Sequence, residues 1–350
     1  MSMNVLVSGG AGYIGSHAVL RLVETGHQVL IVDNLSRGHR EAASVLESIA
    51  PGRVAFEDCD ILETERLAGL MTRHRCDAVL HFAALAYVGE SVEQPLRYYR
   101  NNTAGALSLI QAAEDAGVGR FVFSSTCATY GEPPADQVPI AETCGQSPVN
   151  PYGWSKLMVE RMLIDRAGQA RTGGSPFAFA ALRYFNVAGA DPEGRLGEDH
   201  RPESHLLPIC LEVASGKRES MTIFGDDYDT PDGTCIRDYV HVIDLVNAHL
   251  LVLEALEPGD QRFYNIGVGR GYSVLECIEA CRRVTGHPIP VTMGARRPGD
   301  PPMLTANPER IRRELGFEAR YTDLDEIIET AWHWFRANPQ GYGPATGSGR

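Results

Sequence analysis

A tyrosine, a lysine and a hydroxyl residue occur in an order that suits proton transfer. Tyr152 and Lys156 are four positions apart, so on a helix they share one face and lie one turn from each other. A lysine cation favours the phenolate, and we therefore expect the pKa of Tyr152 to fall from about 10 toward neutral pH. Thr126, upstream of the pair, can bond the same substrate oxygen. Together the three predict a general acid/base that acts on a sugar or alcohol hydroxyl.

A glycine-rich turn near the start of the chain predicts a dinucleotide site. Gly9, Gly12 and Gly15 lie between the first predicted strand and the first predicted helix. Glycine there permits a tight turn and lets the backbone approach a pyrophosphate. Asp33 ends the second strand, where an acidic residue binds the ribose and favours NAD over NADP, although Arg37 lies close by. A turn without a ligand is the plain alternative, and the strand-loop-helix context argues against it.

The ends of the next two predicted strands carry weaker signals for the same cofactor. Asp60 and Ile61 stand where an adenine would lie, but Asp60 is equally suited to cap a helix. The run from His81 to Ala84 is small enough for close contact with a cofactor, or for simple packing.

The pattern of apolar runs predicts an α/β fold. Short apolar runs alternate with helical patterns through the first half of the chain, which indicates a parallel sheet covered on both faces, of the doubly wound Rossmann type. The predicted strands are 4–8, 28–33, 54–58, 78–83, 121–125 and 177–184, and the predicted helices of this half include 12–25, 96–116 and 152–168.

A change of composition after residue 186 predicts a second, smaller domain. Proline and glycine become dense, and the predicted helices are shorter: 206–215, 274–285, 308–315 and 324–338. We assign 1–186 to a Rossmann domain, to which 237–257 return, and 187–338 to a smaller α/β substrate domain. The polar, glycine-rich segment 339–350 is predicted to be a flexible tail.

The bulk properties exclude several classes of partner. The formal net charge of −13 argues against binding to nucleic acid or to an anionic membrane surface. None of the eight cysteines forms a C-x-x-C pair, which favours reduced thiols and a cytoplasmic location. We expect neither a secretory signal nor a membrane span. No metal ligands are predicted, because the histidines considered are scattered: His17, His27, His39, His74, His241 and His249.

With these residues in place, the chain resembles the extended short-chain dehydrogenase/reductase superfamily and, within it, the UDP-glucose 4-epimerase family. The resemblance runs from Met3 to about Tyr342. It rests on SGGAGYIGSH, VDNLSRG, HFAALAYVGES, FSSTCATYG, NPYGWSKLMVE, ALRYFNVAGA, IFGDDYDTPDGTCIRDYVHVIDL and RRPGD. The resemblance implies an NAD-dependent enzyme that interconverts UDP-glucose and UDP-galactose at carbon 4 through a keto intermediate.

The resemblance also implies roles for individual residues. Tyr152 would be the catalytic base, Lys156 would bind the nicotinamide ribose, and Thr126 stands where the family has Ser or Thr. Residues implied to contact NAD are Gly9, Gly12, Tyr13, Ile14, Gly15, Asp33, Asn34, Leu35, Ser36, Arg37, Gly38, Asp60, Ile61, Phe82, Ala83, Ala84, Leu85, Ala86, Asn101, Ser124, Tyr152, Lys156 and Phe185. Residues implied to line the UDP-sugar site are Thr126, Tyr152, Asn186, His205, Leu206, Thr222, Ile223, Phe224, Arg237, Arg297, Asp300 and Leu304. A homodimer through the helices 96–116 and 152–168 is implied as well.

Three positions depart from the family pattern. Ala86 replaces a lysine found near the cofactor in some members, and His205 occupies a place often held by Asn. Leu304 stands where a bulkier tyrosine limits some relatives to unmodified hexoses. An N-acetylhexosamine or a pentose therefore remains an alternative sugar.

Physical chemistry supports the nucleotide end of this site. Arg237 and Arg297 can bind a diphosphate bidentately, and Phe224 offers a face to a uracil ring. The plain alternatives are surface ion pairs for the arginines and core packing for Phe224.

Two other classes of function are weaker alternatives. A nucleotide-sugar dehydratase would need acidic residues directly after Thr126, where Cys127 and Ala128 stand instead. Oxidation of the sugar to an acid would need an activated cysteine, and no cation near Cys127 in sequence indicates one. A regulator that binds NAD without catalysis would not need both Tyr152 and Lys156.

Overall fold

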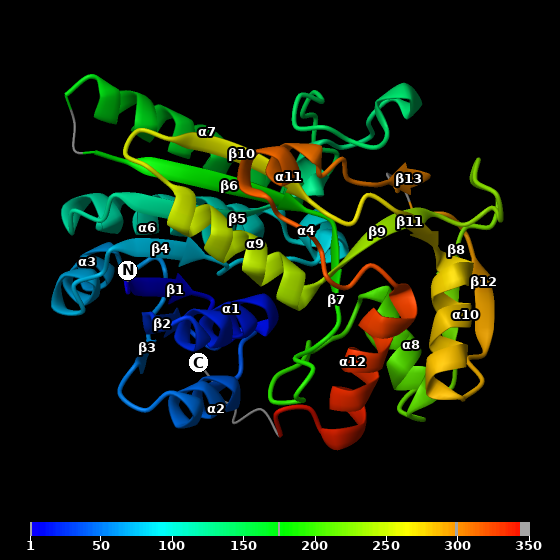
Figure 1. Cartoon of the computed structure of the whole chain (residues 1–350). Coiled ribbons are helices and arrows are strands. Elements are labelled where there is room, and N and C mark those ends of the chain that lie inside the picture. Colours follow the sequence, from blue (N-terminus) through cyan, green and yellow to red (C-terminus); the bar gives the residue numbers. More distant parts are fainter. Residues whose placement is uncertain (1, 174–175, 298–299, 344–350) are drawn as a thin grey trace.

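One sheet of seven parallel strands organises the larger part of the molecule (Figure 1). The computed structural model describes residues 2–173, 176–297 and 300–343. The strand order is β10-β6-β5-β4-β1-β2-β3. The strands are β1 (Asn4–Ser8), β2 (Gln28–Asp33), β3 (Val54–Asp58), β4 (Ala78–His81), β5 (Arg120–Thr126), β6 (Ala178–Tyr184) and β10 (Gln261–Ile266). The order reverses between β1 and β4, and in such sheets ligands bind at that point, outside the carboxyl ends of the strands.

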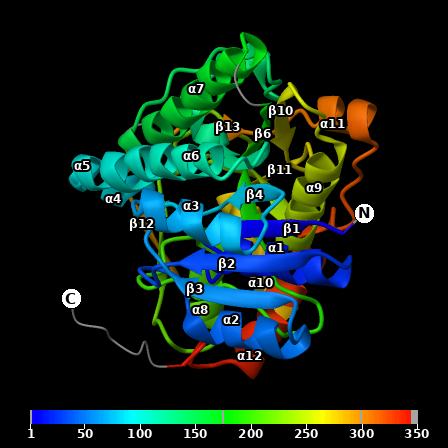
Figure 2. The same cartoon turned by 90° about the vertical axis from the view of Figure 1, so that its left-hand side faces the viewer.

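Helices cover both faces of this sheet. One face packs against α1 (Tyr13–Glu24), α2 (Arg40–Ile49), α9 (Val242–Ala255) and α11 (Glu309–Leu315), and the other against α3 (Thr64–Arg73), α6 (Gly105–Asp115) and α7 (Pro151–Arg171). Because side chains alternate along a strand, Val5 and Val7 enter the first core and Leu6 enters the second. Figure 2 shows α6 and α7 side by side. Among the described residues, no helix has the length and apolar character needed to cross a membrane.

The second, smaller part is a mixed α/β unit with its own core, on the right of Figure 1. It contains a four-stranded sheet of β7 (Asn186–Ala188), β9 (Ile236–His241), β11 (Gly271–Ser273) and β13 (Met303–Leu304), and a pair of β8 (Met221–Phe224) and β12 (Val291–Gly294). Its helices are α8 (Leu206–Ala214), α10 (Val274–Thr285) and α12 (Leu324–Ala337). Side chains from all three helices meet in its core.

The predicted fold class, a doubly wound parallel sheet with a smaller α/β unit, is confirmed. The bounds of β1, β2 and β3 are those predicted. β4 ends at His81, two residues earlier than predicted, because the amides of Phe82 and Ala83 both donate to the carbonyl of Ser8. The predicted helix 96–116 is a succession of α5 (Pro95–Tyr98), a π-helical segment (Tyr99–Ala104) and α6, preceded by α4 (Val88–Glu93).

The segment 237–257, predicted to rejoin the Rossmann domain, is divided between the two parts of the molecule. Of this segment, α9 packs on the large sheet, whereas β9 pairs within the small one. β10, which we did not predict, then joins the large sheet beside β6. Its first three residues, Gln261 to Phe263, are only partly buried, so its sequence lacks the continuous apolar run of the central strands.

The start of the predicted flexible tail packs against the protein. The amide of Tyr342 donates to Oδ2 of Asp199, and its hydroxyl bonds the backbone of Gly197. Its ring lies 5.2 Å from that of Trp334. The remainder of the predicted tail, 344–350, lies outside the described residues.

Candidate active site

The glycine turn between β1 and α1 has the shape that a diphosphate requires. Gly9 has a φ of +75°, and a β-carbon there would lie 2.5 Å from the amide nitrogen of Ala83. A β-carbon on Gly15 would overlap the carbonyl oxygen of Gly9. At Gly12, the N-cap, no side-chain bond caps α1 in the described structure, and the first turn carries no acidic residue. The N-terminal amides of α1 are therefore suited to an anion, and the turn fits the pyrophosphate of a dinucleotide.

The side chains that open α1 point away from this turn. The hydroxyl of Tyr13 donates to the carbonyl of Gly189 at 2.6 Å, and Ile14 packs against the core. Tyr13 and Ile14, both predicted to contact the cofactor, would therefore do so through their backbone atoms.

Asp33 ends β2 beside the glycine turn. Its Oδ2 accepts from the amide of Ala11 at 3.0 Å, and its Oδ1 accepts from the amide of Leu35 at 2.9 Å. Burial raises the pKa of this carboxyl, and the two hydrogen bonds oppose the rise. A β-carbon on Gly38 would lie 2.9 Å from Oδ2, so the chain passes close to the carboxylate. Since each carboxylate oxygen accepts more than one bond, Asp33 retains capacity for ribose hydroxyls.

Arg37 is bound to the protein. Its Nη2 lies 2.7 Å from Oε1 of Glu90, and its Nη1 donates to the carbonyl of Arg201 at 2.9 Å. Its guanidinium also lies 4.8 Å from the centre of the Tyr87 ring. Glu90 also pairs with Arg97, so these contacts fix the position of Arg37 without cancelling its charge.

The Asp60 carboxylate accepts hydrogen bonds from its own turn and from the residue after β2. Its Oδ1 accepts from the amide of Leu62, and its Oδ2 accepts from Asn34 Nδ2, both at 2.9 Å. Asn34 Oδ1 in turn accepts from the amide of Ser36. Ile61 is buried. Asp60 does not cap a helix, because α3 begins at Thr64 with Glu63 as its N-cap, so its carboxylate stabilises the turn that precedes this helix.

Asn102 fixes the loop that follows β4, and sequence reasoning missed it. Its Oδ1 accepts from the amide of Leu85 and its Nδ2 donates to the carbonyl of Leu85, both at 2.9 Å. Nδ2 also lies 3.1 Å from Oγ of Ser155 in α7. The predicted neighbour Asn101 donates to Asn102 Oδ1. One buried amide therefore joins the loop 82–86 to the helix of Tyr152 and Lys156.

Tyr152, Lys156 and Thr126 are all buried at the carboxyl end of β5. Nζ of Lys156 donates to the carbonyl of Ser124 at 2.8 Å and lies 6.0 Å from the centre of the Tyr152 ring. The Thr126 hydroxyl lies close enough to that of Tyr152 to favour the phenolate, and Thr126 Oγ1 accepts from the amide of Ala128. The structure thus brings together the three residues expected to transfer a proton.

The predicted fall in the pKa of Tyr152 is wrong for the protein without ligands. Burial raises the pKa of Tyr152 well above its usual value, and the neighbouring Thr126 hydroxyl only partly opposes this rise. Burial also lowers the pKa of Lys156 to about 7. Both charged forms lose their hydration, and Lys156 faces a carbonyl and the ring of Phe123, 5.0 Å away, rather than a carboxylate.

A buried ion pair holds α7 against the sheet, and sequence reasoning missed it too. Nη2 of Arg183 in β6 lies 2.7 Å from Oε2 of Glu160, and its Nε lies 3.0 Å from Oε1. Oγ of Ser125 donates to the same Oε1 at 2.5 Å. Glu160 lies on α7 one turn beyond Lys156, so the pair fixes the helix beside the strand that carries Thr126. Ser124, the remaining residue of this strand end, bonds the hydroxyl of Tyr184.

The residues predicted for the nucleotide sugar form two groups in the smaller part. Arg237 in β9 pairs with Asp300, and Leu304 in β13 lies opposite Arg237 in the register. The guanidinium of Arg297 lies 4.0 Å from the centre of the Phe224 ring, which is 39% exposed. An exposed aromatic face under an arginine suits a planar base beside a phosphate.

Arg237 connects the first of these groups to the proton-transfer residues. Burial raises the pKa of the Cys127 thiol to about 12, and the charge of Arg237 opposes that rise. Arg237 therefore lies within electrostatic reach of the residue that follows Thr126.

The other predicted contacts vary in what they can offer. Thr222 is exposed and faces Thr292, whereas the side chain of Ile223 is buried in the core of the smaller part. His205 is the N-cap of α8, and Leu206 is its first residue. Phe185 is buried, and Asn186 opens β7.

These features define a class: an α/β enzyme with a dinucleotide turn, a tyrosine–lysine pair at a strand end, and a second lobe with arginines over an aromatic face. A family model for the NAD dependent epimerase/dehydratase family matches residues 5–267. The chain belongs to this family, and its cofactor is NAD.

Individual relatives match nearly the whole chain. A UDP-glucose 4-epimerase of Halalkalibacterium halodurans is 50% identical, with 97% of this chain and 98% of the relative covered. A probable UDP-arabinose 4-epimerase 3 of Oryza sativa subsp. japonica is 46% identical, with 97% and 84% covered. The crystal structure of UDP-glucose-4-epimerase from Stenotrophomonas maltophila, with bound NAD and formylated UDP-arabinopyranose, has a TM-score of 0.90 at 42% identity and covers 96% of this chain and 99% of that one.

Replacing Lys156 with methionine is expected to remove a pH dependence of stability. Burial lowers the pKa of Lys156 from 10.5 to about 7, so the unfolded chain binds more protons than the folded one between these values. The free energy of unfolding of the NAD-free wild type should therefore rise with pH across this window. K156M should exceed the wild type most near neutral pH, by a margin that shrinks as pH rises. Urea unfolding across the window measures this.

Lys217 provides the matched control, because it is exposed and is the only other lysine of the chain. K217M should follow the wild-type pH dependence. Equal pH slopes in K156M and wild type would contradict the assigned pKa of Lys156.

Proposed function

We propose that this chain is a UDP-glucose 4-epimerase, an isomerase that interconverts UDP-glucose and UDP-galactose and retains NAD through turnover. The observation that carries the proposal is the meeting of Tyr152, Thr126 and Lys156 at a strand end flanked by the dinucleotide turn and by Arg237. The identity to relatives of this activity over nearly the whole chain supports it.

In the proposed mechanism, Tyr152 takes the proton of the hydroxyl on sugar carbon 4, with Thr126 bonded to the same oxygen. Bound NAD would accept a hydride from carbon 4 and later return it to the opposite face. Between these events the keto sugar must turn over, so the protein must hold the sugar loosely and the UDP firmly. Arg237 and Arg297 would hold the diphosphate and Phe224 the uracil, which leaves the sugar free to rotate.

The buried setting of Tyr152 defines the role of Lys156 in this mechanism. A phenolate in a dry site is costly unless positive charge lies near it. Lys156 is the cation that α7 places beside the tyrosine ring, and the neighbouring Thr126 hydroxyl also favours the phenolate. In return, the phenolate favours the charged form of Lys156.

The Tyr152→Phe variant tests the proton-transfer role. We expect conversion of UDP-galactose to UDP-glucose, assayed without added NAD, to fall by about 10²–10⁴-fold, because the variant lacks the hydroxyl. The NAD content of the purified variant should equal that of the wild type, which controls for folding. A variant that keeps most of the wild-type rate would remove Tyr152 from the mechanism, and a wild type that fails to interconvert the two sugars even with NAD supplied would refute the proposed function.

A UDP-pentose or a UDP-N-acetylhexosamine is the alternative substrate. The similarity to a UDP-arabinose 4-epimerase favours the pentose, and the modest size of Leu304 favours the larger sugar. Leu304 packs against the cluster of Tyr130 and Phe185 and lies opposite Arg237.

The Leu304→Tyr variant tests whether this position limits the sugar. A larger side chain should reduce kcat/KM for UDP-N-acetylglucosamine by about 10-fold or more, while UDP-glucose and UDP-xylose change little. Leu304→Met, of similar volume, is the control and should leave all three rates near the wild type. An unchanged substrate panel in L304Y would refute a gating role.

Other redox reactions on nucleotide sugars receive less support. Oxidation to an acid would require a thiolate, and burial holds the pKa of Cys127 near 12, which leaves the thiol protonated at neutral pH. A cytoplasmic location is part of the proposal. The eight cysteines are all free, which suits a reducing compartment.

We also propose a homodimer through the helices α4 to α7. Large apolar side chains are exposed along them, with fractions of 80% for Leu96, 62% for Val92, 53% for Leu107 and 41% for Trp154. An exposed apolar surface of this kind favours association, and a second copy related by twofold symmetry would cover it.

Leu107→Glu should convert this dimer to a monomer, because twofold symmetry would bury two unpaired carboxylates. Light scattering coupled to size-exclusion chromatography measures the mass. Met293→Glu, on β12 and 50% exposed, is the control and should leave the mass unchanged. A wild type that is monomeric at micromolar concentration, or a dimer that survives L107E, would contradict this interface.

A further inference from the structure

Two carboxylates and two imidazoles converge in the segment between β7 and α8. Glu198, His200, Glu203 and His205 each offer one ligand atom, and these atoms all lie within 4.8 Å of one another. The Glu198 and Glu203 side chains are only 7% and 4% exposed, and those of His200 and His205 are 22% and 40% exposed. The cluster is thus closed on the carboxylate side and open on the histidine side.

Four nitrogen-to-oxygen separations within the cluster are close to those around a four-coordinate metal ion. Nδ1 of His200 lies 2.9 Å from a Glu198 oxygen and 3.8 Å from a Glu203 oxygen. Nδ1 of His205 lies 3.3 Å and 2.9 Å from oxygens of the same two residues. Ligand atoms placed tetrahedrally at zinc bonding distances would be about 3.3 Å apart. The observed values lie on both sides of that separation.

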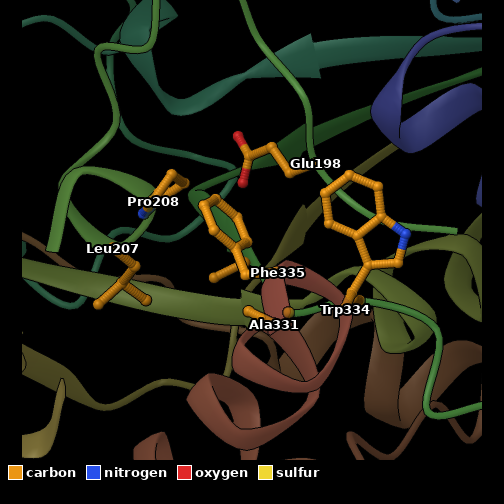
Figure 3. Close-up of a pocket in the computed structure, with 9 residues that line it drawn as sticks. Glu198, Leu207, Pro208, Ala331, Trp334 and Phe335 are labelled. Atoms are coloured by element: carbon orange, nitrogen blue, oxygen red, sulfur yellow. The ribbon is translucent and has the colours of Figure 1, made fainter. Parts of the chain in front are cut away.

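Charge balance requires positive charge within the cluster. Glu198 lines a small pocket with Pro208, Trp334 and Phe335, so apolar groups surround one of the two carboxylates (Figure 3). Two buried carboxylates this close repel each other unless positive charge lies between them. A divalent ion with two neutral imidazoles would supply that charge. Without an ion, a protonated His205 supplies that charge: burial lowers the pKa of this imidazole, but its bonds to Glu198 and Glu203 outweigh burial and raise the pKa to about 10.

The hydrogen bonds of the cluster occupy some ligand positions and leave others available. Oε1 of Glu203 accepts from the backbone amides of Ser204 and His205 at 2.7 and 2.8 Å, which fixes the carboxylate at the start of α8. The same oxygen is hydrogen-bonded to Nδ1 of His205 at 2.9 Å, and an ion would replace this bond. Its Oε2 is the oxygen that faces His200. The Nδ1 atom of His200 is buried and has no partner of proper hydrogen-bond geometry among the described residues. A metal ion binds an imidazole nitrogen whose lone pair is not used in a hydrogen bond.

The cluster lies between the cofactor turn and the first helix of the smaller part. The rings of Tyr13 and Tyr87 stand edge-on to the His200 ring, with centroids 6.1 and 5.9 Å away. Tyr13 opens α1 at the cofactor turn, and His205 caps α8 in the smaller part. An ion held here would fasten the connection between the two parts of the molecule beside the cofactor turn.

We propose that Glu198, His200, Glu203 and His205 form a binding site for one divalent transition-metal ion of the zinc class. Imidazole and carboxylate ligands in a four-coordinate arrangement favour Zn²⁺ over Mg²⁺ or Ca²⁺, which take oxygen ligands in larger number. From the sequence, His205 was assigned to the UDP-sugar site and no metal site was predicted, although the four residues occur within the single stretch EDHRPESH.

Metal binding by the full-length, NAD-loaded protein tests the proposal without reference to activity. After treatment with a chelator, calorimetric titration with Zn²⁺ should show one site per chain with a Kd below about 10 µM. Co²⁺ should bind at the same site and give the visible absorption of a four-coordinate ion. Absence of stoichiometric Zn²⁺ binding, or of the Co²⁺ band, would overturn the proposal and leave the His205 imidazole as the source of positive charge.

The H200A/E203Q double variant identifies the ligands. It should weaken Zn²⁺ binding by at least about 100-fold. The control H287A/E279Q changes an exposed histidine and an exposed glutamate elsewhere and should bind like the wild type. If H200A/E203Q does not fold, the single variant H200A should lose the four-coordinate Co²⁺ band while keeping its NAD. Wild-type affinity or an unchanged band in these variants would place the ion elsewhere and overturn the site.

Discussion

The active site depends on the removal of water from Tyr152 and Lys156. Burial shifts the pKa of each group toward its neutral form, since a charge in this site has lost its hydration. The two charges stabilise each other only when both are present, so proton transfer to the phenolate and the charge on the lysine are coupled. The surrounding structure therefore has to keep these side chains close, dry and fixed.

Buried polar contacts supply that rigidity from three directions. The Glu160–Arg183 pair binds α7 to the sheet, and its oxygens also accept from Ser125 in the neighbouring strand. Asn102 binds the opposite side of α7 to the loop after β4. These contacts are well satisfied, which is the condition under which buried polar groups rigidify a core. The carbonyl of Ser124 then sets the position of the lysine.

Much of the fold could be read from the chain, because the central strands are continuous apolar runs with turn residues between them. β10 could not, since an edge strand that is buried only in part carries no such run. The proton-transfer residues were recognisable from type and spacing. Asn102, Glu160 and Arg183 were not, because each acts through a partner more than 15 positions away.

The sequence by itself determined the sheet and the glycine turn, because both follow from local periodicity and short spacings. It also determined which residues are proposed to transfer the proton: Tyr152, Lys156 and Thr126. Tertiary structure alone decided the direction in which the pKa values move. A spacing of four on a helix places the Lys156 cation near the Tyr152 phenol, but this spacing does not determine how far the fold buries the two groups. In this protein desolvation outweighs that proximity, so the spacing predicted the partners correctly and the sign of the pKa shift of Tyr152 wrongly.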